Sequence, residues 1–142
     1  MTPRYRSLLA AAFTVLSTVS MAQGGNTSFN WKFEEASKLM EEKLYNQAAE
    51  IWKELVTEQP ENANLNYRLG LSYFSSFNQK AKALPYLEKA STLRKGGNYG
   101  GFNTAGYDPF DPRETNAPVE VDYYLGRAYH LNENFDKADL FY

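Results

Sequence analysis

The sequence contains no cysteine and only one histidine, His130. Without cysteine the chain forms neither a disulfide bond nor a thiolate metal site, whatever the redox state of its compartment. A Ser-His-Asp arrangement has one candidate base, and His130 lacks the companion of an H-E-x-x-H motif. The glycines between residues 96 and 101 do not follow the order of a phosphate-binding loop. We therefore expect no enzyme activity, no cofactor and no metal.

An excess of charge of either sign is also lacking. Fifteen basic residues face 17 acidic ones, which gives a net charge of −2. Nucleic-acid binding needs a clustered basic surface, so we expect no nucleic-acid partner. The 142 residues are 43% hydrophobic and 15% aromatic, which is enough for one folded domain and argues against disorder.

Long hydrophobic runs are limited to one stretch of twelve residues, LLAAAFTVLSTV, at positions 8–19. It follows two arginines and precedes the small residues Ser20 and Ala22. The run is short for a bilayer span, and this three-part order is typical of a secretory signal peptide. A buried N-terminal helix is the alternative. We expect residues 1–22 to be a signal peptide, residues 23–29 a short linker, and the mature chain to be exported without a transmembrane segment.

A short motif, L-G-x-x-Y, occurs twice, as LGLSY at residues 69–73 and LGRAY at residues 125–129. A segment with small residues at helical spacing follows each motif, ALPYLEKA after the first and ADLFY after the second. AAEIWKEL is a similar segment upstream. Small residues let two helices cross closely while larger ones fill the space beside them. The spacing predicts three copies of a two-helix unit, at about 30–62, 63–95 and 119–142.

Proline and asparagine mark the expected helix ends. Pro60 should end the second helix, and Asn62 should cap the third. Pro85 is tolerated if its helix begins near residues 80–82, because first-turn amides have no intrahelical acceptor to lose. We place the turn of the first unit at residues 44–46 and the start of the third unit near Val119.

The two L-G-x-x-Y motifs lie 56 residues apart, and the surplus falls in residues 95–118, which hold five glycines and three prolines. We expect a loop insertion there. Asp108, Asp111 and Glu114 lack the spacing of a calcium loop. An ordered segment laid over the helices is expected, and contact with a partner is the alternative. The aromatic residues expected to pack on the helices are Tyr99, Phe102, Tyr107 and Phe110.

The pattern L-G-x-x-Y, then A-x-x-x-[aromatic or Leu]-x-x-[small], then Pro, resembles the tetratricopeptide repeat, whose period is 34 residues. The first unit departs from it with Glu35-Ala36, and the second has one extra residue in its turn. The resemblance implies an all-α solenoid of helical hairpins, with two full repeats and a truncated third. It also implies a concave surface lined by the first helix of each repeat, which binds a protein or peptide. In some tetratricopeptide domains, Lys, Asn and Arg side chains on these helices hold the C-terminal carboxylate of a chaperone. At the corresponding positions of this chain, only Arg68 is suitable for that role. By repeat phase the partner-binding residues would include Asn30, Phe33, Asn64, Tyr67, Leu71, Phe74, Tyr123, Arg127 and His130.

Residues 114–118 and 123–132 resemble the tetratricopeptide region of Bacteroidota envelope proteins. Those proteins continue into a β-propeller and an OmpA-like peptidoglycan-binding domain, and some relatives serve type IX secretion. This resemblance implies a non-catalytic interaction scaffold in the periplasm or on the periplasmic side of the outer membrane. A structural or anchoring segment of a larger envelope protein is the alternative. The third unit is about ten residues short of a full repeat, so we expect the chain to be a fragment or a truncated gene product.

Overall fold

The computed structural model describes residues 21–95 and 107–142, and within these ranges it contains helices and no strand. The expected all-α class is confirmed. The predicted signal peptide lies outside the described residues apart from positions 21 and 22, and so do Tyr99 and Phe102. The helices are α1 (Met21–Glu41), α2 (Tyr45–Glu58), α3 (Ala63–Ser75), α4 (Ala83–Leu93), α5 (Glu120–Leu131) and α6 (Phe135–Ala138), with short 3-10 turns at η1 (Lys80–Lys82) and η2 (Asp139–Phe141).

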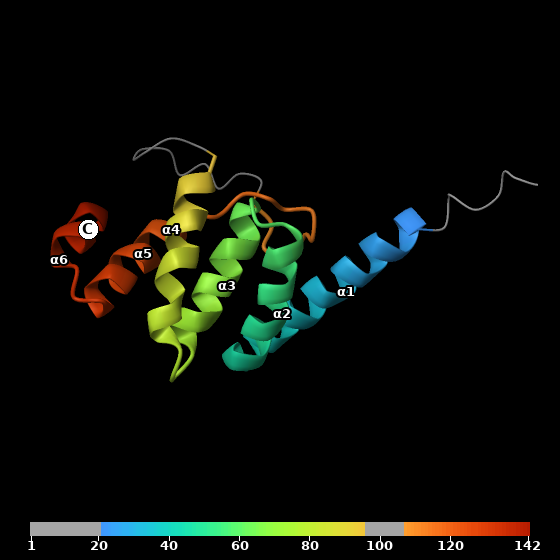
Figure 1. Cartoon of the computed structure of the whole chain (residues 1–142), viewed down its shortest axis with the longest axis horizontal. Coiled ribbons are helices and arrows are strands. Elements are labelled where there is room, and N and C mark those ends of the chain that lie inside the picture. Colours follow the sequence, from blue (N-terminus) through green and yellow to red (C-terminus); the bar gives the residue numbers. More distant parts are fainter. Residues whose placement is uncertain (1–20, 96–106) are drawn as a thin grey trace, which may run out of the picture.

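The helices follow one another across the molecule in chain order (Figure 1), and each packs against the next one along the chain. The second helix of each expected unit, α2, α4 or α6, packs against the first, as the spacing predicted, and α2 and α4 also pack against the helix that follows them. In addition, α3 contacts α5. None of the described helices has the length and apolar character needed to cross a membrane.

Small residues occupy the same place in each pair of helices. Ala36, Gly70 and Gly126 are buried in the first helices of the three pairs. A Cβ atom added at Gly70 would lie 2.8 Å from Cγ of Leu87 in α4, and one at Gly126 would lie 2.9 Å from Cβ of Phe141. The prediction that glycine lets the paired helices approach closely is confirmed at Gly70, whereas the close neighbour of Gly126 lies in η2.

The turns of the first and third pairs share one geometry. Lys43 and Glu133, each at the end of a first helix, adopt left-handed backbone with φ of 62° and 58°. In each turn the next N–H bonds to a carbonyl five residues back, the Schellman closure of a helix. Because Lys43 already closes α1, residues 45 and 46 belong to α2, and the predicted turn at 44–46 is wrong by about two residues.

The turn of the second pair, which has one residue more than the repeat pattern, differs in geometry from the other two. Ser76 is extended, with φ −72° and ψ 149°, and η1 leads into α4. Pro85 is the third residue of α4, where it removes no intrahelical bond, as expected. Pro60 lies just beyond α2, and the side-chain oxygen of Asn62 accepts from the N–H of Leu65 at 3.1 Å. These predicted helix ends are confirmed.

The segment 23–29 was expected to be a linker, but in the structure it is part of α1. Phe29 is 9% exposed and belongs to the core, which favours continuation of the helix. One turn later, Lys32 forms ion pairs with Glu54 and Glu58 of α2, both at 3.0 Å. The helix thus extends further toward the N-terminus than the sequence pattern indicated.

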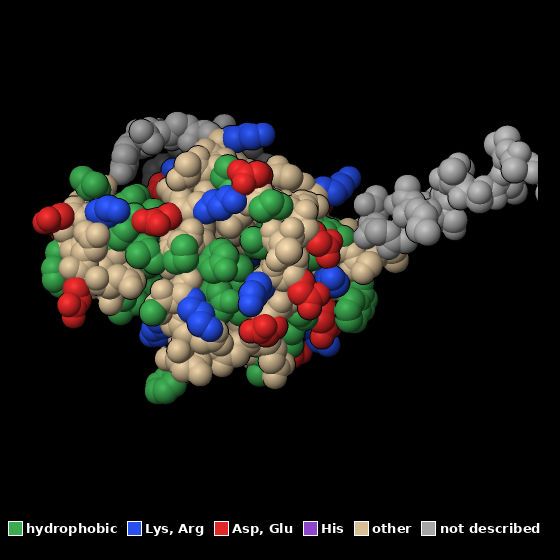
Figure 2. Space-filling view, in the orientation of Figure 1, with side chains coloured by type: hydrophobic (Ala, Val, Ile, Leu, Met, Phe, Trp, Pro, Cys, Tyr) green, Lys and Arg blue, Asp and Glu red, His purple; other side chains and the backbone are tan. Residues whose placement is uncertain are grey.

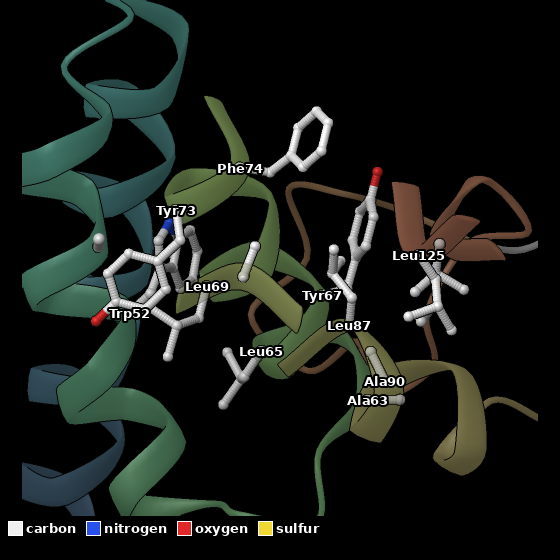
Figure 3. Close-up of a cluster of buried hydrophobic side chains, with 14 of the residues drawn as sticks. Trp52, Ala63, Leu65, Tyr67, Leu69, Tyr73, Phe74, Leu87, Ala90 and Leu125 are labelled. Carbon is white, nitrogen blue, oxygen red and sulfur yellow. The ribbon is translucent and has the colours of Figure 1, made fainter. Parts of the chain in front are cut away.

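The core lies between the paired helices and consists of the apolar stripes that the periodicity predicted. Phe33 and Trp52 meet edge to face with ring centroids 5.1 Å apart, and both are fully buried. Leu65, Leu69 and Leu87 continue this core toward α5 (Figure 3). On the face seen in Figure 2, hydrophobic side chains gather in the middle and charged groups of both signs surround them.

Candidate functional site

The first helices of the three pairs meet through their side chains. The Arg68 guanidinium of α3 lies 5.9 Å from the ring centre of Phe33 in α1. Tyr124 of α5 contacts Tyr67 and Phe74 of α3, with ring centroids 6.3 Å and 5.5 Å apart. The residues that repeat phase assigned to partner binding, together with Arg68 and Tyr124, are called here the α1/α3/α5 face. It comprises Asn30, Phe33, Asn64, Tyr67, Arg68, Leu71, Phe74, Tyr123, Tyr124, Arg127 and His130.

The residues predicted to bind a partner differ widely in exposure. Leu71 is half-buried, while Tyr67 and Phe74 are buried at 7% and 8% exposure. Phe33 and Asn64 are fully buried. A partner cannot reach these last two residues in this arrangement, because Phe33 packs against Trp52 and Asn64 lies beneath the chain's own segment 107–109. The exposed members of the predicted set are Asn30, Tyr123, Arg127 and His130.

One half of the face, around Asn64 and Arg68, is covered by residues that follow the insertion. The Tyr107 hydroxyl donates to Oδ1 of Asn64 at 2.9 Å, and the Pro109 carbonyl accepts from the Arg68 guanidinium. Burial raises the pKa of Tyr107, which the nearby Arg68 partly opposes. The expectation that Tyr107 packs onto the helices is confirmed. The same expectation for Phe110 is wrong, because this residue is 58% exposed.

The same segment completes the start of α3. The Thr115 carbonyl accepts from the N–H groups of Ala63 and Asn64, at 3.0 Å and 3.4 Å. First-turn amides have no acceptor within their own helix, so this carbonyl supplies one. Figure 1 shows the segment crossing beside that end of α3. Nothing in the sequence pattern indicated this contact, since it joins positions about fifty residues apart.

Arg68 is 7% exposed and its guanidinium lies beside the Phe33–Trp52 ring pair, 5.9 Å from the ring centre of Phe33 and 5.6 Å from that of Trp52. Cation–π contacts of this kind stabilise a desolvated guanidinium. Its Nε atom finds no acceptor in the part of the chain that the structure describes, and neither does Nδ2 of Asn64. The covered half therefore contains two buried donor atoms that have no acceptor among the described residues.

The other half of the face is open and centres on α5. Tyr123 is 50% exposed, and the Arg127 guanidinium lies 5.7 Å from its ring and 5.3 Å from that of Phe74. Arg127 also donates to the Tyr123 hydroxyl at 3.3 Å. Tyr67 lies between α3 and α5 at the border of the two halves (Figure 3), and burial is the main cause that raises its pKa. An open pocket of about 250 Å³ adjoins this half and is lined by Arg127, His130, Leu131 and Tyr142.

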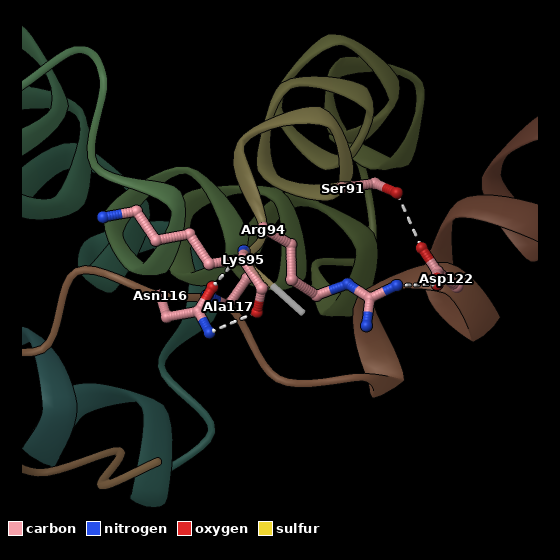
Figure 4. A network of polar contacts seen from close by, with 6 residues as sticks. All are labelled: Ser91, Arg94, Lys95, Asn116, Ala117 and Asp122. Carbon is pink, nitrogen blue, oxygen red and sulfur yellow. Dashed lines mark hydrogen bonds and ion pairs between the residues drawn. The ribbon is translucent and has the colours of Figure 1, made fainter. Parts of the chain in front are cut away.

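The position of α5 depends on a polar network that joins it to α4 (Figure 4). The Asp122 carboxylate accepts from the Arg94 guanidinium and from the Ser91 hydroxyl, both at 2.6 Å. Beside it, the side chain of Asn116 exchanges two hydrogen bonds with the backbone of Lys95, at 2.8 Å and 3.0 Å. These contacts close the two ends of the insertion and orient the open half of the face.

The three carboxylates considered for a calcium loop have separate local roles. Asp108 accepts from the N–H of Phe110 at 2.9 Å, and Glu114 accepts from the N–H of Asn116 at 2.8 Å. Asp111 bonds to Arg113, whose side chain lowers the pKa of that carboxyl. Each carboxylate thus stabilises a turn of the segment.

Comparison with known proteins yields no match: no protein-family model, no curated protein sequence and no solved structure shows significant similarity to the chain. Assignment of function therefore rests on the residues described above.

Proposed function

We propose that the chain is a tetratricopeptide-type scaffold of the bacterial cell envelope that binds a protein partner through the open half of the α1/α3/α5 face. The observation that carries this proposal is the exposed cluster of Tyr123 and Arg127 beside Phe74. Tyrosine and arginine dominate the binding energy of many protein interfaces, especially where the surroundings already hold them in place. Here the neighbouring rings hold the Arg127 guanidinium before any partner arrives.

The geometry of the helix pairs supports a repeat protein. The equivalent residues Ala36 and Gly70 lie one 34-residue period apart, and the buried alanines Ala48, Ala83 and Ala138 recur in the second helices. The first and third pairs also share their turn geometry. Such arrays present an extended surface on their first helices, which suits a protein or peptide ligand.

The test is a cross-linking pull-down that uses the full chain as bait in envelope extracts. We expect Tyr123→Ala and Arg127→Ala to lose most of the captured partner, because truncation of a hot-spot tyrosine or arginine lowers affinity at least about tenfold. Phe77→Ala is the matched control. Phe77 is 98% exposed, like a partner-binding aromatic residue, but lies in the turn after α3 and not on this face. Capture that is equal for all three variants would refute the proposal.

Export is the second part of the proposal, and it rests on the three-part pattern of residues 1–22. Expression of the full gene in a bacterial host should give a periplasmic product whose first residue is Gln23, measured by intact mass. A cytoplasmic product that begins at Met1 would contradict it.

A structural or anchoring segment of a larger envelope protein is the alternative, and one observation favours it. Half of the predicted binding face is already covered by the chain's own residues around Tyr107 and Pro109. If the face serves only to hold the fold together, the Tyr123 and Arg127 substitutions will change stability but not the set of captured proteins.

A further inference from the structure

Residues 107–109 lie on α3 as a short peptide ligand lies on its receptor. Two side chains of α3, Asn64 and Arg68, hold them, one through the Tyr107 hydroxyl and one through the Pro109 carbonyl. The two α3 residues are four positions apart and therefore project from the same side of the helix. Asp108 between the two contacts is exposed and turns its carboxylate to the N–H of Phe110.

Residues 115–117, which follow in the chain, are held in another way. Thr115 bonds to the first amides of α3, Asn116 bonds to the backbone of Lys95, and Ala117 is 3% exposed in the core. These residues belong to the framework of the fold. The stretch 107–109 instead contacts α3 through side chains on the binding face, so it can detach while residues 114–118 stay in place.

The site beneath this stretch is incompletely satisfied. Asn64 is fully buried and Arg68 is 7% exposed, yet one donor atom of each has no acceptor among the described residues. Buried donors without partners destabilise the arrangement that contains them. A ligand that brings additional carbonyl or carboxylate oxygens would satisfy these donors better than residues 107–109 do.

We propose that Asn64 and Arg68 form a peptide subsite that residues 107–109 occupy within the chain, and that a partner segment of similar chemistry displaces them. The segment would be extended and would place a tyrosine hydroxyl at Asn64 and oxygen acceptors, carried by a proline-containing stretch, at Arg68. This inference rests on the proposed function and adds to it the class of partner segment and a competition with the chain itself. A tethered segment acts at an effective concentration of about millimolar, which excludes a weak free peptide from the wild-type site.

The test uses a fluorescent synthetic peptide with the sequence of residues 107–113 and measures its anisotropy with the full chain. Tyr107→Ala removes the ring and hydroxyl that hold the tethered segment, so this variant should bind the peptide at least about tenfold more tightly than the wild-type chain. Adding Arg68→Met to the same variant should abolish binding. Equal affinity for wild type and Tyr107→Ala would overturn the inference.

The peptide itself provides the control for folding defects. Replacing its tyrosine with phenylalanine should weaken binding to Tyr107→Ala about fivefold, the usual effect of one lost hydrogen bond, even if Arg68→Met does not fold. Phe110→Ala is the matched protein variant, because Phe110 is exposed in the same segment, and it should behave as wild type. An unchanged affinity for the phenylalanine peptide would also overturn the inference.

Three further outcomes are informative. A concentration-dependent dimer of the wild-type chain in sedimentation that Tyr107→Ala abolishes would show that a second copy supplies the segment, which would overturn a separate partner. The peptide test is also independent of the pull-down. The peptide has the chain's own sequence, so its binding does not depend on the partner captured through Tyr123. Peptide binding without partner capture would refute only the proposed function, and capture without peptide binding would refute only this inference.

Discussion

The substitution Gly70→Ala tests whether close helix crossing determines the fold. A Cβ atom at this position would lie 2.8 Å from Cγ and from Cδ2 of Leu87, and 3.2 Å from the backbone nitrogen of the same residue. Leu87 is fully buried, and because its backbone nitrogen also lies within 3.2 Å, rotation of its side chain alone does not remove the close contact. Relief therefore requires α4 to move away from α3.

Two effects of opposite sign set the magnitude. Alanine favours a helix over glycine by about 1 kcal/mol. Overpacking of a filled core destabilises by about 1–3 kcal/mol, and the upper part of that range applies where backbone must move. We expect a net loss of about 1–2 kcal/mol in the free energy of unfolding, which corresponds to a fall in Tm of about 3–8 °C for a domain of this size.

The assay is urea unfolding followed by circular dichroism, with Gly126→Ala as the matched control. That Cβ atom would meet Cβ of Phe141 at 2.9 Å, but its other neighbours lie at 3.5 Å or more, and Phe141 is only partly buried in the final turn η2. We expect its stability to change by less than about 0.5 kcal/mol, because η2 can shift while the helix gains propensity. Wild-type stability of Gly70→Ala, or an equal loss for Gly126→Ala, would refute the reasoning.

Three further predictions concern single polar contacts. Asn62→Ala should lower the free energy of unfolding by about 1 kcal/mol in urea unfolding, because it removes the cap of α3. Asp122→Asn should lower it by about 1–2 kcal/mol and reduce its dependence on salt, because the 2.6 Å ion pair with Arg94 is lost; equal salt dependence would contradict this. Burial first and the Glu88 carboxylate second raise the pKa of Tyr129 to about 12, which favours the protonated phenol in the folded state. The resulting stability is present below about pH 10 and is lost as the pH rises to about 12, so wild type should lose more stability over this interval than Tyr129→Phe.

The sequence alone determined the helix pairs. Its period of small residues located the helix crossings at Gly70 and Gly126, and Pro60 and Asn62 located a helix boundary. These features are local. The effect of a residue on its own helix, or on the next helix along the chain, depends little on the rest of the molecule. The turn near Lys43 was misplaced because a lysine in left-handed backbone carries no sequence signal of the kind that glycine would give.

The candidate binding face could be predicted only in part. Repeat phase identified Tyr123 and Arg127, which are exposed, but also Phe33 and Asn64, which are buried. Helical periodicity shows which side of a helix a residue occupies, but not what covers that side. In this chain the cover comes from residues 107–118, far along the sequence, whose contacts with α3 follow no period.

The sequence therefore determined most of the helical segments and the close approach at Gly70, because those properties follow from side-chain size and spacing along each helix, but it did not indicate the N-terminal extension of α1. Tertiary structure alone decided which part of the shared face stays open. That outcome depends on Tyr107 reaching Asn64, on Thr115 completing α3, and on Asp122 holding α5 against α4. Each of these contacts joins residues roughly thirty to fifty positions apart, and only the folded chain brings them together.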